Sequence, residues 1–224
     1  MATSLLIQSY EQAVDTIRTF GILPLSSFIP EHPSLESITS PEAWHTGLDS
    51  DPWLWRDRFA VEGVAAYGRF FKKKPVLVSA ALFPLLHAAW NDGLTPEERY
   101  EEGGLSIAAK KIHAAVTEQG GIDTKSLRAA VGMKDKGAKS DYDKALIELQ
   151  ESVDLVIAGI SDRLNENGQK SGWNSTCYEL ADRWMRQHGL QPSTLHSRDA
   201  KQQILAHLEP VCTEKAYAWF QKLW

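Results

Sequence analysis

The segment from residue 105 to residue 179 constrains the fold of this chain most strongly, because it combines three helical patterns with two strand patterns. Gly120 and Gly121 end the first helical stretch, and Asp123 can cap a second one that Gly132 ends. A third stretch begins at Ser140, which we predict to be its cap. Its apolar residues recur at the spacing of one buried helix face, and they are Tyr142, Ala145, Leu146 and Leu149.

Two strand patterns follow, at residues 153–160 and 173–179, on either side of a polar loop. The loop holds Asn167-Gly168, a dipeptide typical of tight hairpin turns. Three helices followed by a hairpin predict a winged helix-turn-helix, in which this loop is the wing. We therefore predict an α+β protein, mainly helical, whose winged helix packs with an N-terminal helix and β-hairpin region.

The first hundred residues contain the helix and the hairpin of that region. Ser9 and Gly21 have the positions of an N-cap and a C-terminal glycine around one amphipathic helix, and Asp51-Pro52 can open another. Strand patterns at 65–71 and 76–79 flank a lysine-rich turn. The expected division is an N-terminal region over 1–104, a winged-helix domain over 105–185, and C-terminal helices over 186–224 that pack on the core.

Composition and motifs limit the classes of function. The formal net charge of −5 over 224 residues allows a basic surface only as a local patch. Cys177 and Cys212 lack the spacing of a metal or redox pair, and no apolar run could span a bilayer, so we expect reduced thiols in a cytoplasmic protein that does not enter a membrane. Zinc, P-loop, dinucleotide and serine-hydrolase motifs do not occur, so we expect no metal, no cofactor, and a binding protein rather than an enzyme.

The loop before Ser140 is the strongest candidate for contact with an anion, because it places lysines at the start of a helix. Double-stranded DNA is the partner that this arrangement suggests, and nothing in the sequence supports a homo-oligomer. Acidic residues of the third helix would repel the phosphates of DNA, so the alternative is a winged helix used only for packing or for contact with another protein. These residues are Asp141, Asp143, Glu148 and Glu151. The residues expected to contact nucleic acid are Lys134, Lys136, Lys139, Ser140 and Lys144, with Arg163 and Lys170 in the wing.

Aromatic residues are dense between residues 44 and 67. Trp44, Trp53, Trp55 and Tyr67 could form a pocket that stacks a planar ligand or a base. The spacing of Trp55 and Phe59, four residues apart on one helix, favours a packed aromatic core instead.

Four segments together resemble the short bacterial proteins grouped as AlkZ-related, over roughly residues 9 to 180. The resemblance implies a relationship to the AlkZ/YcaQ winged-helix DNA glycosylases, which excise alkylated bases without a metal. Those enzymes carry a Gln-x-Gln or Gln-x-Asp motif, which this sequence lacks, so no catalytic residue can be carried over, and a glycosylase-like enzyme stays the alternative to a binding protein. The segments are Asp51-Pro-Trp-Leu-Trp-Arg56, Ala66-Tyr-Gly-Arg-Phe-Phe71, Ala145-Leu-Ile-Glu-Leu-Gln150 and Asp154-Leu-Val-Ile157.

Overall fold

A computed structural model describes residues 6–90, 93–161 and 174–223. The described residues form ten α-helices and a six-stranded antiparallel sheet, and 49% of the structure is helical, which confirms the predicted α+β class. None of the described helices has the length and apolar character that crossing a lipid bilayer requires.

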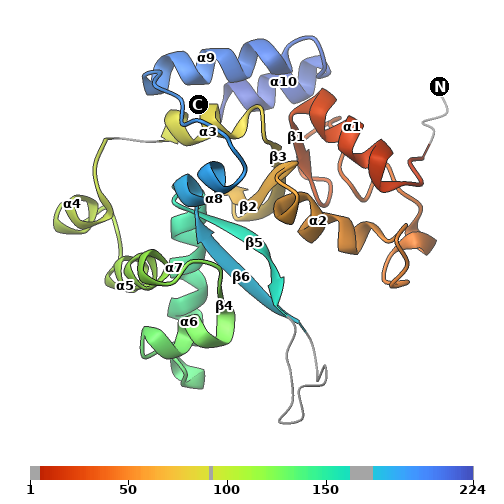
Figure 1. Ribbon diagram of the computed structural model, residues 1–224. Helices are drawn as coiled ribbons and strands as arrows, with labels where there is room; N and C mark the ends of the chain where they lie inside the picture. Colours follow the sequence, from red (N-terminus) through yellow and green to blue (C-terminus); the bar gives the residue numbers. More distant parts are fainter. Residues whose placement is uncertain (1–5, 91–92, 162–173, 224) are drawn as a thin grey trace.

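The helices and strands follow the chain in the order shown in Figure 1. The strands are β1 (Ile22–Pro24), β2 (Ala65–Phe71), β3 (Lys74–Ser79), β4 (Ile122–Asp123), β5 (Leu155–Ser161) and β6 (Ser175–Leu180). The helices are α1 (Tyr10–Phe20), α2 (Pro52–Val61), α3 (Phe83–Trp90), α4 (Pro96–Glu101), α5 (Ile107–Glu118), α6 (Thr124–Ala130), α7 (Lys139–Glu151), α8 (Ala181–Gln187), α9 (Ser197–Leu208) and α10 (Glu214–Gln221). Short 3₁₀ turns occupy Pro41–Ala43 and Lys136–Ala138.

Local capping explains where the N-terminal helices begin. Ser9 accepts a hydrogen bond from the amide of Gln12, whose side chain in turn accepts one from the Ser9 amide, so α1 opens with a complete capping box. Asp51 accepts from the amide of Trp53 at the start of α2, and Pro52 occupies the first helical position. Both helices therefore begin where the sequence predicts.

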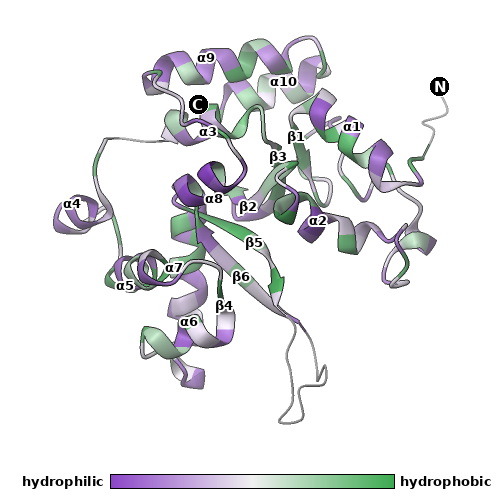
Figure 2. Ribbon diagram, in the orientation of Figure 1, coloured by the Kyte–Doolittle hydropathy of each residue, from purple (hydrophilic) through white to green (hydrophobic). Residues whose placement is uncertain are grey.

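The sheet has the strand order β1-β3-β2-β5-β6-β4 and separates two hydrophobic cores. Successive side chains of a strand point to opposite faces. Tyr67 and Ile157 accordingly belong to the core under α1, α2, α5 and α7, whereas Ala66 and Val156 belong to the core under α3, α8, α9 and α10. Figure 2 shows the result: β5 is largely hydrophobic, while α8 and the outer side of α9 are hydrophilic.

The β2–β3 turn has an unusual backbone. It consists of Lys72 and Lys73, whose φ angles of 48° and 61° lie in the left-handed region that glycine and asparagine occupy more readily. The amide of Lys73 donates to Glu151 Oε1 at 3.0 Å, at the end of α7. The turn is thus anchored to α7, although its two residue types disfavour this backbone conformation.

Three features differ from the sequence-based expectations. Strand β4 was not predicted; it is two residues long and pairs with β6 through Ile122 and Tyr178. A helical pattern starts at Ala80 in the sequence, whereas the helix α3 begins at Phe83. The helix α7 begins at Lys139 after a 3₁₀ turn, so the prediction that Ser140 caps it is wrong.

The expected division into three regions stays a prediction. The sheet crosses its first boundary, because β2 pairs with β5 through Tyr67 and Ile157. Figure 1 shows α3, α9 and α10 gathered at one end of the molecule and α5, α6 and α7 at another. The assignment of the second group as a winged helix also stays a prediction.

Candidate functional site

The loop between α6 and α7 is held in place by Arg128. Its Nε donates to the carbonyl oxygen of Met133 at 2.9 Å, and its Nη2 donates to the carbonyl oxygens of Lys134 at 3.3 Å and Asp135 at 3.1 Å. The guanidinium carbon also lies 5.5 Å from the centre of the Tyr142 ring. One half-buried side chain therefore fixes three successive carbonyl groups of the loop, a role that the sequence pattern did not indicate.

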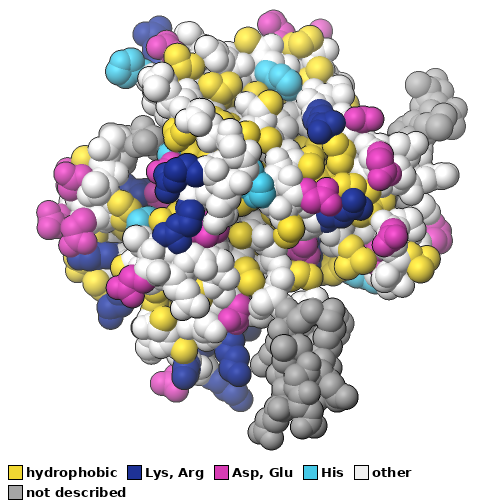
Figure 3. Space-filling view, in the orientation of Figure 1, with side chains coloured by type: hydrophobic (Ala, Val, Ile, Leu, Met, Phe, Trp, Pro, Cys, Tyr) yellow, Lys and Arg dark blue, Asp and Glu magenta, His cyan; other side chains and the backbone are white. Residues whose placement is uncertain are grey.

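The lysines of this loop are exposed, and so is Ser140. Figure 3 shows Lys and Arg side chains gathered at the end of the molecule where α6 and the beginning of α7 lie. Between residues 125 and 144, exposed lysines outnumber exposed aspartates by five to three, so this end of an otherwise acidic chain has a positive balance. The lysines are Lys125, Lys134, Lys136, Lys139 and Lys144, and the aspartates are Asp135, Asp141 and Asp143.

The first backbone amides of α7 contribute less to this site than the sequence suggests. The 3₁₀ turn runs directly into the helix, and the amide of Lys139 donates to the carbonyl oxygen of Lys136. Ser140 is the second residue of the helix, where its side chain makes no cap. An anion at this end would therefore meet ammonium groups and a hydroxyl more than free helix N–H groups.

Two of the four acids of α7 are engaged elsewhere in the fold. Glu148 accepts hydrogen bonds from the amide and the hydroxyl of Ser106 at 2.7 and 2.6 Å, at the start of α5. Glu151 accepts from the amide of Lys73. Both lie in the second half of α7, so their charges stabilise neighbouring chain segments and lie away from the lysine loop.

The other predicted contact residues are less well placed. Lys144 forms an ion pair with Asp141 at 3.7 Å, and it lies about 140° around α7 from Lys139. Arg163 and Lys170 lie outside the described residues. The structure therefore brings together Lys134, Lys136, Lys139 and Ser140 but leaves Lys144 to one side.

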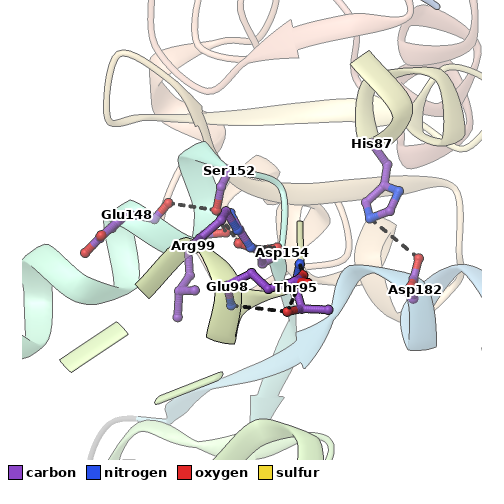
Figure 4. Close-up of polar contacts among 9 residues, drawn as sticks. His87, Thr95, Glu98, Arg99, Glu148, Ser152, Asp154 and Asp182 are labelled. Atoms are coloured by element: carbon purple, nitrogen blue, oxygen red, sulfur yellow. Dashed lines mark hydrogen bonds and ion pairs between the residues drawn. The ribbon is translucent and has the colours of Figure 1, made fainter. Parts of the chain in front are cut away.

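A second polar cluster surrounds a cavity of about 300 Å³ between α3, α4, α5 and α8. Figure 4 shows Arg99 reaching from α4 to Asp154, with an Nη2 to Oδ1 distance of 2.6 Å, and His87 of α3 facing Asp182 of α8 at 3.5 Å. Ser152 also donates to Asp154. These ion pairs join α4 to the segment just before β5, and α3 to α8.

The aromatic residues predicted as a group are divided by the structure. Trp44, Trp53 and Tyr67 line a cavity of about 600 Å³. Trp55 does not: it is 1% exposed in the core, where its Nε1 donates to the carbonyl oxygen of Asp49 at 2.7 Å. A core and a pocket thus coexist in this region, built from opposite sides of α2.

Polar groups from three segments complete the cavity. Arg56, Arg69 and Glu36 line it together with the aromatic rings. Burial raises the pKa of Tyr67, and the positive charge of Arg56 opposes that effect. The sequence did not predict Arg69 or Glu36 as residues of this pocket. Arg69 lies two residues after Tyr67, however, which is the spacing of neighbours on one face of a strand.

A family model described as AlkZ related matches residues 7–224. The chain belongs to the AlkZ-related family. No curated protein and no solved structure matches it.

Two of the segments that carry the resemblance meet at the aromatic cavity of this AlkZ-related protein. Trp53 and Arg56 come from the first segment, and Tyr67 and Arg69 from the second. The third segment ends at Gln150, whose Oε1 accepts from the amide of Arg69 at 3.1 Å. The first two segments therefore line the cavity, and the third contacts the second behind it.

Neither cysteine of the AlkZ-related chain is part of a disulfide. Cys177 and Cys212 are free thiols. Burial raises the pKa of Cys212 to about 11, which disfavours the reactive thiolate. Over residues 6–90, 93–161 and 174–223, no three His, Cys, Asp or Glu side chains gather as a metal site.

Proposed function

We propose that this AlkZ-related protein binds double-stranded DNA through the end of the molecule formed by α6, the loop after it and the start of α7. The order α5, α6, α7, β5, β6, with β4 added beside β6, supports a winged helix-turn-helix domain over residues 105–185. In helix-turn-helix proteins the second helix of the motif lies against the DNA, and that helix here is α7.

The observation that carries the proposal is the fixed, lysine-rich loop. Arg128 holds its carbonyl groups, so Lys134, Lys136 and Lys139 project from a backbone that is already ordered. Each ammonium that neutralises a phosphate releases a counterion from the duplex, which drives binding at low salt. A preordered loop loses less conformational entropy on binding than a free one.

The acids of α7 define how the helix approaches the duplex. Asp141 and Asp143 are exposed near its beginning and oppose a close approach of their own faces to phosphates. We therefore assign the main contact to the loop and to Ser140, rather than to the length of α7. Contacts to phosphates position a protein but read no sequence, so the expected preference among DNA sequences is weak.

Fluorescence anisotropy with a labelled duplex tests this function across a salt series. Wild-type protein is expected to bind at about 50 mM salt and to lose affinity steeply towards about 200 mM. Binding no stronger than background at low salt, or an affinity that is indifferent to salt, would remove the proposal.

Two triple variants locate the contact. Both remove three positive charges, so a difference between them reports position rather than net charge. Loss of affinity in the loop variant alone supports the proposal, and equal losses in both variants contradict it. The loop variant is Lys134→Gln, Lys136→Gln and Lys139→Gln, and the control, on exposed residues of α8, α9 and the segment after α10, is Arg186→Gln, Arg198→Gln and Lys222→Gln.

A further inference from the structure

The aromatic cavity has the size and the lining of a ligand site. Its volume of about 600 Å³ lies within the range of pockets that hold small organic molecules. It is bordered by the loop after β1, the segment around Trp44, the beginning of α2 and strand β2. Leu25, Pro41 and Pro75 supply further apolar surface.

Its aromatic walls are held in place before any ligand arrives. The Nε1 of Trp44 donates to Thr39 Oγ1 at 2.9 Å, and Tyr67 lies in a strand that pairs on both sides. The guanidinium of Arg56 lies 3.3 Å from the centre of the Trp53 ring. Fixed rings can stack on a planar group without first being ordered, which favours binding.

The charges of the lining select the kind of planar group. The lining holds two guanidinium groups, Arg56 and Arg69, and one carboxylate, Glu36, so an anionic group of a ligand would find a guanidinium partner there. The Nε of Arg56 is 3.3 Å from Asp57, whereas Arg69 is exposed and makes a long hydrogen bond of 3.4 Å to the carbonyl oxygen of Lys73. Arg69 is thus the guanidinium less committed to the protein itself, and a guanidinium fork matches the oxygens of a phosphate.

Glu36 requires a hydrogen-bond donor on the ligand in addition to the anionic group. Its carboxylate accepts hydrogen bonds, so a ligand that fills the cavity should carry an N–H donor as well as an anionic group. A purely apolar aromatic ligand would cover Arg69 without offering its guanidinium an anionic partner. A sugar phosphate would satisfy Arg69 but would leave three aromatic rings without a planar surface to stack on.

We propose that this cavity binds a nucleotide, with the base against Trp44, Trp53 and Tyr67 and the phosphate on Arg69. A base with an exocyclic amino group gives Glu36 its donor. The same chemistry is offered by a free mononucleotide and by a base within a single strand. The inference does not depend on the proposed duplex contact, because Arg69 contacts Gln150 at one end of α7 and the lysine loop precedes the other end, about 17 Å away along the helix.

Isothermal titration with three probes tests the chemistry of the site in the wild-type protein. Adenosine monophosphate is expected to bind, whereas adenosine and ribose phosphate, which lack the phosphate and the base respectively, should each bind about tenfold more weakly or worse. A short single-stranded oligoadenylate distinguishes the two sources. Tighter binding of the strand identifies a base within nucleic acid as the ligand, and equal or weaker binding identifies the free nucleotide. Absence of binding by both adenosine monophosphate and the strand overturns the proposal.

Two variants separate the roles of the lining from a general effect on folding. Arg69→Gln should weaken the binding of adenosine monophosphate about tenfold and leave that of adenosine unchanged, because only the phosphate loses its partner. Trp53→Leu should weaken both ligands. Arg186→Gln, on exposed α8, removes the same charge outside the cavity and should change neither. Equal effects of Arg69→Gln on adenosine and on its monophosphate would overturn the assignment of the phosphate to Arg69.

Discussion

Replacement of Arg128 by lysine tests whether the fixed loop, rather than charge alone, favours DNA binding. The substitution keeps a positive charge at the same place but removes the fork that spans the carbonyl groups of Met133, Lys134 and Asp135. A single ammonium can retain about one of the three hydrogen bonds. The variant therefore separates the number of charges from the order of the loop.

The expected magnitude follows from the two hydrogen bonds that are lost. At about 0.5–1.5 kcal/mol each for a half-buried donor, their loss raises the cost of ordering the loop by about 1–3 kcal/mol. Since 1.4 kcal/mol corresponds to a tenfold change in affinity, Arg128→Lys should bind duplex DNA about 5- to 100-fold more weakly. The salt dependence should stay close to that of the wild type, because the number of lysines able to meet phosphates is unchanged.

Anisotropy and amide hydrogen exchange together measure this effect. The amides of residues 133–138 should exchange faster in Arg128→Lys, while the global unfolding temperature changes little. Lys125→Gln is the matched control on the same helix: it should leave loop exchange unchanged and lower the salt slope by about 0.9 if Lys125 meets a phosphate. Wild-type affinity in Arg128→Lys, or weaker binding without faster exchange, would refute the reasoning.

Three further predictions concern stability. Lys73→Gly should raise the free energy of unfolding by about 0.5–1 kcal/mol in chemical denaturation, because glycine tolerates a φ of 61°. Lys74→Gly in β3 should lower the free energy of unfolding, and a lower value in both variants would show that the backbone of Lys73 is not strained. Asp51→Ala should lower the free energy of unfolding by about 3 kcal/mol in thermal unfolding, because the buried carboxylate accepts hydrogen bonds from three backbone amides. Asp49→Ala, at an exposed position, should lower it little, and equal losses would show that the hydrogen bonds of Asp51 do not stabilise the fold. Burial lowers the pKa of His32, so the unfolded state binds more protons below about pH 6.5 and stability should fall there by up to about 1.4 kcal/mol per pH unit. His32→Gln should flatten that dependence, and an unchanged profile would count against it.

Local signals account for the features that the sequence predicted well. Ser9, Asp51 and Asp123 each cap a helix through bonds to residues two or three positions away, so the information is contained in a short window. Trp55 and Phe59 recur at helical spacing, and both are buried. Trp53, two residues before Trp55, lies on the opposite side of the same helix and is 37% exposed, as helical periodicity implies.

Features that depend on distant partners were not predictable in the same way. Strand β4 is too short to show a pattern, and its pairing with Tyr178 joins segments more than fifty residues apart. The hydrogen bonds from Arg128 to the loop carbonyl groups depend on the path that the loop takes after α6. Glu36 and Arg69 meet in one cavity only because β1 and β2 belong to the same sheet, on either side of β3.

The central claim is that the lysine loop contacts duplex DNA, and footprinting of lysine amines tests it most directly in wild-type protein. The protein is treated with an amine-reactive reagent with and without duplex, and modification is measured at each lysine by mass spectrometry. The account predicts protection of Lys134, Lys136 and Lys139, with Lys215 and Lys222 modified equally in both states. Uniform modification of the loop lysines in the presence of bound duplex, or protection confined to the C-terminal lysines, would contradict it.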